Sequence, residues 1–284
     1  MTGAVPQWLL TAFVVPTVFA VMLGIGLGVT PGELRRVWQA PGPMLRGLFA
    51  VLVAVPALAL AITRVLDLPR AVEVGIVLMA ISPGAPVALR SSVSAGGQAA
   101  FAPSLQISVA LLAVASMPLS LAALEQMYAA HASISPWDVM RQVFVAQLLP
   151  LGLGIGLRNL APSLAERMAP GVRRAATALL LVTLALVVVE IWQPAVRAGL
   201  RSVAAIALTT VAALAAGHLL GGRSPGMRTS VAIASAARNP GLALLVATLN
   251  GAPPAITAAI LAYLAVSVPV IGFYALWRRY AGAP

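Results

Sequence analysis

The sequence contains no cysteine and no lysine, and only seven of its 284 residues are acidic. The absence of cysteine excludes disulfides, thiolate metal sites and cysteine nucleophiles. Both histidines, His131 and His218, lack partners at metal-ligand spacing. No combination of nucleophile and base is present either. We therefore expect no enzymatic activity, no catalytic residues, no metal site and no resident cofactor.

Apolar residues are what the chain has in excess. They make up 61% of it, charged residues make up 9%, and the mean hydropathy is +0.98. Soluble globular domains carry about 25% charged residues. The composition predicts an integral membrane protein, with the lipid bilayer as its main partner. Eighteen arginines give a net charge of +11, but no basic run exceeds two residues, so the charge indicates membrane-flanking loops rather than a nucleic-acid partner.

Nine apolar segments are expected to cross the membrane within a single transmembrane domain over residues 1–284. Seven are uninterrupted: 8–29, 43–65, 98–124, 138–160, 172–192, 196–220 and 253–278. Two more, 71–94 and 227–250, are each interrupted near the middle. Apolar residues do not alternate with a period of two, so the fold class is an all-α membrane protein. The longest connections expected are 125–137 and 161–171.

The arginines also predict an orientation. With the N-terminus outside, eleven arginines fall at the cytoplasmic ends of the spans and five at the outer ends. The positive-inside rule therefore favours an outer N-terminus and a cytoplasmic C-terminus, in the cell (inner) membrane.

Two Pro-Gly breaks are the features around which the chain is organised. They are Ser82-Pro83-Gly84 and Asn239-Pro240-Gly241. Each half of a broken segment has about ten residues, so as a helix it reaches roughly 15 Å, half of a bilayer core. Non-helical backbone at that depth is tolerated only inside protein or beside a water-filled cavity. Paired breaks of this kind indicate the binding site of a secondary transporter, and an ordinary proline kink is the alternative.

The two breaks belong to an internal repeat. Pro83 and Pro240 are 157 residues apart, and a shift by this number brings the spans 8–29 and 43–65 close to 172–192 and 196–220. The span 138–160 has no counterpart in the first half. An odd number of crossings therefore separates the copies, which predicts an inverted repeat.

The residues at the breaks predict an anion site. Ser82 and Asn239 are good N-cap residues, and Pro83 and Pro240 suit the first position of the helix that follows. Gly84 and Gly241 complete the breaks. Each downstream half-helix would then point its free N–H groups and the positive end of its dipole at the membrane centre. Two such ends favour an anion, particularly a carboxylate.

Polar side chains near the breaks extend this predicted substrate site, which comprises Ser82, Arg90, Gln106, Arg238 and Asn239. An arginine within a membrane segment is expensive and is a candidate for function. Its guanidinium can also form two hydrogen bonds with one carboxylate. For Arg90, snorkelling to the interface or a structural ion pair is an equal alternative. The glycine-rich stretches 24–28 and 152–156 are interpreted as helix-packing faces.

These features resemble the bile acid:sodium symporter family. Ser82-Pro83-Gly84 matches the family's Cys/Ser-Pro-Gly break, and 233–242 resembles its Glu-x-Gly-x-Gln-Asn-Ser-Gly-Leu stretch. The resemblance implies two discontinuous crossed helices, a core (43–124 and 197–279) and a panel (8–29, 138–160 and 172–192). It also implies alternating access by movement of the panel against the core.

The residues that bind sodium in this family are largely replaced here. The crossover glutamate corresponds to Ala234, the glutamine beside the asparagine to Arg238, and a threonine to Gln106. The Ser-Asn pair corresponds to Ala88-Leu89, a serine corresponds to Ala102, and Asn239 is retained. We expect the Arg238 guanidinium to replace a cation, so that sodium, although conceivable as a co-ion, lacks its usual ligands.

Three functions follow as hypotheses. The favoured one is a secondary transporter of small organic anions that works without the sodium sites. The second is a sodium-coupled organic anion or bile acid symporter with a rebuilt cation site. The third is a membrane anion sensor that does not transport. Substrate identity, direction of transport and oligomeric state are not indicated by the sequence.

Overall fold

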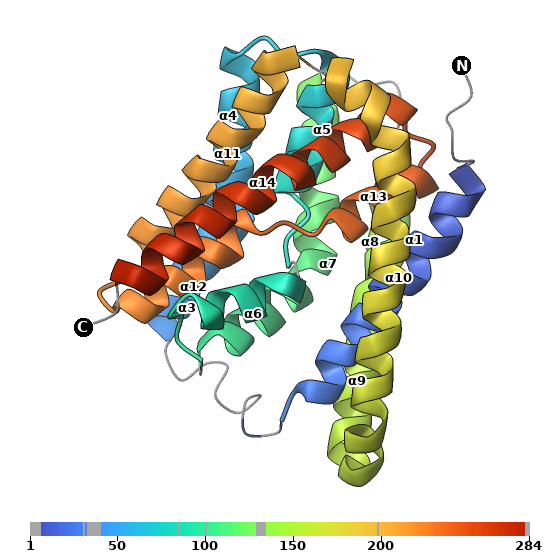
Figure 1. Cartoon of the computed structure of the whole chain (residues 1–284), viewed down its shortest axis with the longest axis vertical. Coiled ribbons are helices and arrows are strands. Elements are labelled where there is room, and N and C mark those ends of the chain that lie inside the picture. Colours follow the sequence, from blue (N-terminus) through green and yellow to red (C-terminus); the bar gives the residue numbers. More distant parts are fainter. Residues whose placement is uncertain are drawn as a thin grey trace.

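The computed structural model describes residues 7–30, 32, 41–84, 86–99, 101–128, 135–197 and 199–281. Helices dominate these ranges and no strand occurs in them (Figure 1). By length and composition, six helical segments of the described part can cross a membrane, and Ala12–Gly28 adds a shorter apolar helix. The predicted class of all-α membrane protein is confirmed.

The elements follow one another closely along the chain. They are α1 (Gln7–Gly28), α3 (Pro41–Phe49), η1 (Ala50–Ala54), α4 (Val55–Val65), α5 (Arg70–Ala80), α6 (Pro86–Ser94), α7 (Phe101–Tyr128), α8 (Pro136–Val143), η2 (Phe144–Leu148), α9 (Leu149–Leu160), α10 (Pro162–Arg197), α11 (Gly199–Leu220), α12 (Pro225–Ala236), α13 (Pro240–Leu249) and α14 (Pro254–Ala281).

Each predicted span coincides with a helix or a run of helices, but α10 is much longer than expected. It has 36 residues and begins at Pro162, ten positions before the predicted span 172–192. Proline suits the first position of a helix, and the following Leu, Ala, Glu, Arg and Met residues are good helix formers. The expected connection at 161–171 is therefore wrong. In the other expected connection, α7 continues to Tyr128 and residues 129–134 lie outside the described part.

Two helices each contain one turn of π-helix that precedes a proline. In η1 the Val55 N–H donates to the Ala50 carbonyl, and in η2 the Leu149 N–H donates to the Phe144 carbonyl. The next residue in each case, Pro56 or Pro150, has no N–H to donate. The wider turn shifts the hydrogen-bond register past the proline without breaking the helix.

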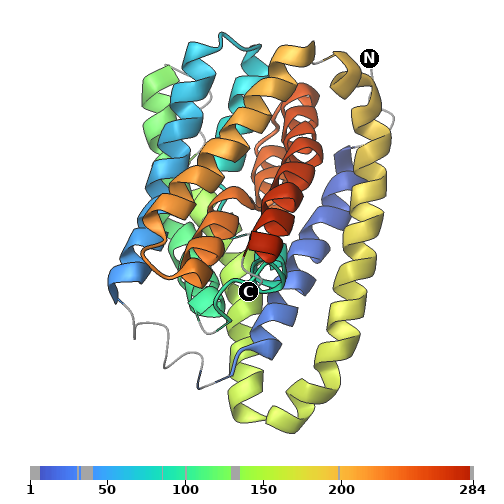
Figure 2. The ribbon, with the colours of Figure 1, turned by 60° about the vertical axis from the view of Figure 1, so that its left-hand side comes forward.

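Helices α1, α9 and α10 pack side by side, and α10 also packs against α14, which pairs with α5 (Figures 1 and 2). The contact of α1 with α9 is made by the glycine-rich stretches. A β-carbon on Gly26 would lie 2.9 Å from Cα of Gly154, and one on Gly154 would lie 2.8 Å from Cα of Gly26. The interpretation of the stretches as packing faces is confirmed at Gly26 and Gly154, which pack against each other.

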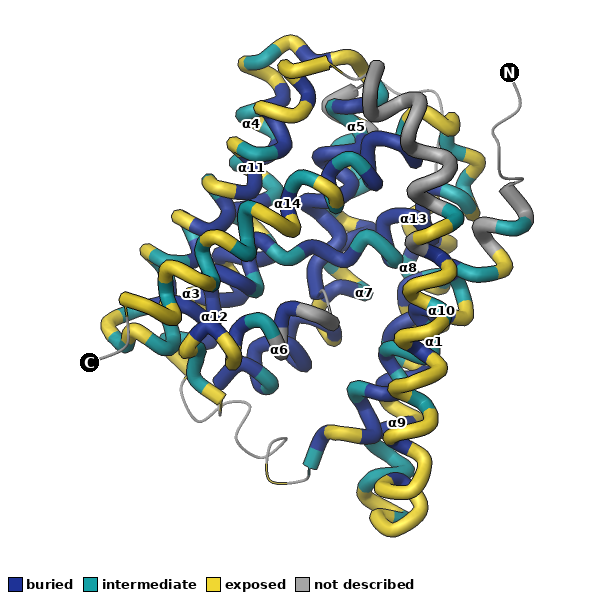
Figure 3. Tube along the Cα trace, viewed as in Figure 1, coloured by how far each residue is buried: buried dark blue, intermediate teal, exposed yellow. Residues whose placement is uncertain are grey.

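The outward faces of the helices are apolar, whereas most of α13 is enclosed. On α11, Leu208, Val211 and Leu219 are exposed, and on α14 Phe273 is 75% exposed. On α13, by contrast, residues Leu242 to Ala247 are buried without exception (Figure 3). Exposed apolar surface on this scale suits lipid rather than water. The buried stretch of α13 is therefore enclosed by other helices on all sides.

The close approach of α1 and α9 yields a first prediction. Gly154→Ala should lower the melting temperature in detergent, because the new β-carbon would meet backbone atoms of α1 that cannot rotate away, at 2.6 Å from the Leu23 carbonyl oxygen. Overpacking of this kind costs about 1–3 kcal/mol. Gly156→Ala, in the same helix but with nothing within 4 Å of the new atom, is the matched control and should leave the melting temperature unchanged or slightly higher. Equal losses in both variants would contradict this packing.

Candidate functional site

The two Pro-Gly breaks touch each other. The backbone N–H of Asn239 donates to the Ser82 carbonyl at 2.9 Å, and Asn239 Nδ2 reaches the Gly84 carbonyl at 3.5 Å. Ser82 is fully buried and Asn239 is 4% exposed. The discontinuous segments α5–α6 and α12–α13 therefore cross at their breaks, as predicted.

The second break has the predicted local chemistry. Asn239 has an extended backbone, and its Oδ1 accepts a hydrogen bond from the Leu242 N–H at 3.1 Å. Pro240 occupies the first position of α13, where a missing N–H costs nothing. Asn239 is thus an N-cap, and its side chain satisfies one of the N–H groups at the start of α13.

The first break differs from the prediction. Ser82 is not an N-cap: its hydroxyl donates backwards to the Leu78 carbonyl at 2.7 Å, at the end of α5. Helix α6 begins at Pro86, so Pro83 is not its first residue. Gly84 has φ +85°, a conformation incompatible with a helix, and Pro86 provides a second start three residues after Pro83. The two breaks are therefore not equivalent in length.

Arg238 lies at the crossing and is held by backbone carbonyls. Its side chain is buried, with 4% of the residue exposed. Nη1 donates to the Val51 carbonyl at 3.0 Å and to the Ala80 carbonyl at 2.9 Å. Both acceptors are available for physical reasons. Val51 stands five residues before Pro56, which has no N–H to offer it, and Ala80 ends α5, where carbonyls lack helical partners and the dipole is negative.

The rest of the guanidinium has no protein partner. Nε and Nη2 of Arg238 are buried and make no hydrogen bond within the described part of the chain. No carboxylate there forms an ion pair with Arg238. Tyr263, on α14, is also fully buried. A buried cation without an anionic partner is costly, so these free N–H groups can donate hydrogen bonds to a bound anion.

Two buried amides flank Gly84. A β-carbon built on this glycine would lie 3.6 Å from Nε2 of Gln106 and 3.6 Å from Nε2 of Gln147. Gln106, on α7, is 5% exposed and its Nε2 has no partner among the described residues. The structure thus brings the predicted residue Gln106 to the break. It adds Gln147, which lies in η2 and is completely buried.

The sequence prediction missed Gln147. The signal for it was weak: a single polar side chain in the middle of an apolar span, which often only bonds to a neighbouring helix. Arg90 lies on α6, the half-helix that follows the first break, and its side chain lies outside the described part of the structure. Its predicted contact with a substrate stays a prediction.

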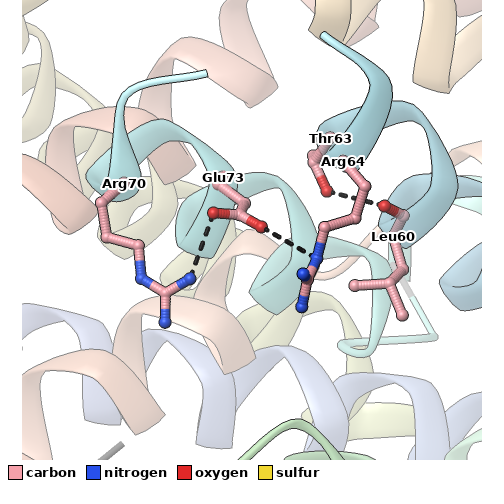
Figure 4. Close-up of polar contacts among 5 residues, drawn as sticks. All are labelled: Leu60, Thr63, Arg64, Arg70 and Glu73. Atoms are coloured by element: carbon pink, nitrogen blue, oxygen red, sulfur yellow. Dashed lines mark hydrogen bonds and ion pairs between the residues drawn. The ribbon is translucent and has the colours of Figure 1, made fainter. Parts of the chain in front are cut away.

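The acidic residues with described side chains stand at helix ends. Glu73 forms ion pairs with Arg64 at 3.6 Å and Arg70 at 3.1 Å, and so ties the end of α4 to the start of α5 (Figure 4). Thr63, on the same turn, donates to the Leu60 carbonyl. Glu166 pairs with Arg158. These pairs connect neighbouring helices, and none of the described carboxylates forms an ion pair with Arg238 at the crossing.

Residues 15–193 match a family model described as the Sodium Bile acid symporter family. This match includes the first break and ends before the second. The P3 proteins of Mus musculus and Homo sapiens are each 25% identical to the chain over 152 residues, which cover 53% of this chain and 32% of the relative. The P3 protein of Bos taurus is 24% identical over the same length.

The chain thus matches about a third of the length of these relatives. The family model covers well over half of the chain and includes the first of the two breaks that cross at the centre of the fold. The chain belongs to the Sodium Bile acid symporter family.

Proposed function

We propose that this protein is a secondary transporter of small organic anions, chiefly carboxylates, which bind where the two broken helices cross. Membership of the symporter family supports transport as the general activity. The observation that carries the choice of an anion is the state of Arg238. Its Nε and Nη2 groups are buried, positively charged and unpartnered among the described residues. A carboxylate can accept hydrogen bonds from both groups at once.

The same residue argues against a requirement for sodium. Nη1 of Arg238 already lies between two carbonyl oxygens, from the π-helical turn η1 and from the end of α5. Backbone carbonyls are suitable ligands for a small hard cation, and here a tethered guanidinium occupies them. The positive charge that a bound ion would contribute is supplied by the protein, so substrate binding needs no co-ion.

Alternating access would come from movement of a panel against a core. The core comprises 43–124 and 197–279, and the panel comprises 8–29, 138–160 and 172–192. Two contacts support this division. Val18, on α1, touches the break at Gly241, where a β-carbon would lie 2.7 Å from its Cγ2, and Gln147 reaches the break at Gly84. A sliding panel would therefore cover and uncover both breaks together.

The distribution of the arginines supports the proposed orientation. At one end of the molecule, Arg228 Nε donates to the Gly222 carbonyl, Arg278 donates to Thr229 and Pro225, and Nη1 of Arg46 lies near Gly222. Arg64 and Arg70 pair with Glu73 elsewhere, at the joint of α4 and α5. We place the first group on the cytoplasmic side of the cell membrane, with the N-terminus outside.

Substitution of Arg238 tests the proposal directly. Carboxylates such as lactate, propionate and succinate should raise the melting temperature of the purified protein equally in sodium and in choline buffer, because a ligand of the folded state stabilises it. Arg238→Gln should weaken this binding about ten- to a hundredfold, because the carboxylate loses a charged hydrogen-bonding partner. Arg223→Gln, which removes an equal charge from an exposed position, is the matched control and should bind normally.

Two results would contradict the proposal. Undiminished carboxylate binding by Arg238→Gln would remove Arg238 from the site. Stabilisation that appears only in sodium would favour the alternative, a sodium-coupled organic anion symporter with a rebuilt cation site. Uptake into liposomes by the purified protein would then separate a transporter from a sensor.

Pro56 provides an independent test, because it leaves the Val51 carbonyl free for Arg238. Pro56→Ala supplies an N–H that competes for this carbonyl within the helix. Alanine favours helix over proline by about 3 kcal/mol, yet we expect carboxylate binding to weaken several-fold as the guanidinium loses an acceptor. Pro269→Ala, inside α14, removes a helix proline elsewhere and is the control. Normal binding by Pro56→Ala would show that the proline does not act through Arg238.

A further inference from the structure

Gln147 is a buried polar side chain that the proposed carboxylate site does not use. It lies in η2, within the continuous run of α8, η2 and α9, and none of its surface is exposed. The π-helical turn before Pro150 sets where this side chain points. A regular α-helix would direct residue 147 to a different angle around the axis.

The amide of Gln147 is poorly satisfied by the protein. Nε2 makes one long hydrogen bond, to the Ala110 carbonyl at 3.4 Å, and Oε1 has no partner among the described residues. Leaving such a group buried and unpaired costs about 1–3 kcal/mol. We therefore expect this buried and poorly hydrogen-bonded amide, three residues before a proline, to have a partner that binds transiently.

Gln106 presents the complementary atom. Its unpartnered group is the donor Nε2, whereas that of Gln147 is the acceptor Oε1. The Nε2 atoms of both glutamines lie 3.6 Å from one point above Gly84, so they are no farther apart than twice this distance. The two amides together offer one hydrogen-bond donor and one acceptor beside the same glycine.

A hydroxyl group is the simplest ligand for such a pair. Its oxygen accepts a hydrogen bond from one amide and its hydrogen is donated to the other. A carboxylate has no proton to give to Oε1 of Gln147, and a keto group satisfies the donor alone. The chemistry of the free atoms therefore selects a hydroxyl over both.

We propose that Gln106 and Gln147 form a hydroxyl-binding subsite next to the carboxylate site, so that the preferred substrates are small hydroxy acids. This inference rests on the proposed function. The crossing of the broken helices connects the carboxylate site with the hydroxyl subsite. Asn239 follows Arg238 in the chain, and its Nδ2 reaches the carbonyl of Gly84, the glycine that both amides flank. One ligand can therefore place its carboxylate toward Arg238 and its hydroxyl toward Gly84.

The subsite has one member in each of the two proposed moving parts. Gln106 belongs to the core helix α7, and Gln147 belongs to the panel segment 138–160. A hydroxyl between them would join panel to core only while substrate is bound. The hydroxyl would thus contribute to recognition and also to closure around the substrate.

The experiment compares acids that differ only in the hydroxyl group. Affinities of the purified full chain for lactate against propionate, and for 2-hydroxyisovalerate against isovalerate, are measured by isothermal titration. Wild type should favour the hydroxylated acid of each pair by roughly three- to tenfold, the effect of one net hydrogen bond. Gln147→Met, which keeps the length of the side chain without its amide, should abolish the preference and leave the affinity for propionate within about twofold.

Gln142 supplies the matched control. It lies on α8, five residues earlier in the same run of helix, and its Oε1 accepts a hydrogen bond from Asn250 Nδ2 at 3.1 Å. Gln142→Met also removes an amide from this segment, but we expect it to retain the preference for hydroxy acids. A preference that survives in Gln147→Met, or equal losses for both members of a pair, would overturn the subsite while leaving the carboxylate site intact. Failure of every acid to bind wild type would overturn both proposals.

Discussion

A guanidinium buried within a membrane protein must find oxygen acceptors, and at Arg238 two backbone carbonyls meet this requirement for Nη1. Neither carbonyl would be available in a regular helix. One is released because Pro56 lacks an N–H, and the other belongs to Ala80, where α5 stops short of the break. The interruption of α5, the π-helical turn and the position of the charge therefore depend on one another. Removal of any one of them leaves either an unpaired carbonyl or an unsatisfied cation.

Much of this architecture follows from local rules that can be read in the sequence. Long apolar runs without alternation can only be helices in lipid, which predicts the spans. Asn239 followed by proline is a helix start by its own chemistry, and the side chain does cap α13. Gly26 and Gly154 were predicted to be packing residues, because small side chains let helices approach closely, and they lie in contact.

Other features depend on partners that are distant in the chain, and the sequence did not reveal them. Serine is a common N-cap residue, but Gly84 and Pro86 together place the start of α6 too far along the chain for the Ser82 side chain to cap it. The burial of Gln147 beside Gly84 results from the packing of η2 against α7, which no local pattern encodes. Helix α10 was predicted too short, because its first ten residues are helical without being apolar enough to suggest a membrane span.

The attachment of the positive charge to the protein has an electrical consequence. In the proposed transport, the charge on Arg238 would stay with the protein, so an organic anion that crosses without a co-ion would move its own negative charge through the membrane potential. This transfer is worth about 2.3 kcal/mol per charge for every 100 mV. A potential that is negative inside drives such an anion outward. A carrier of the proposed kind would therefore be biased toward export, and uptake against the potential would need a steep inward concentration gradient or a proton that travels with the anion.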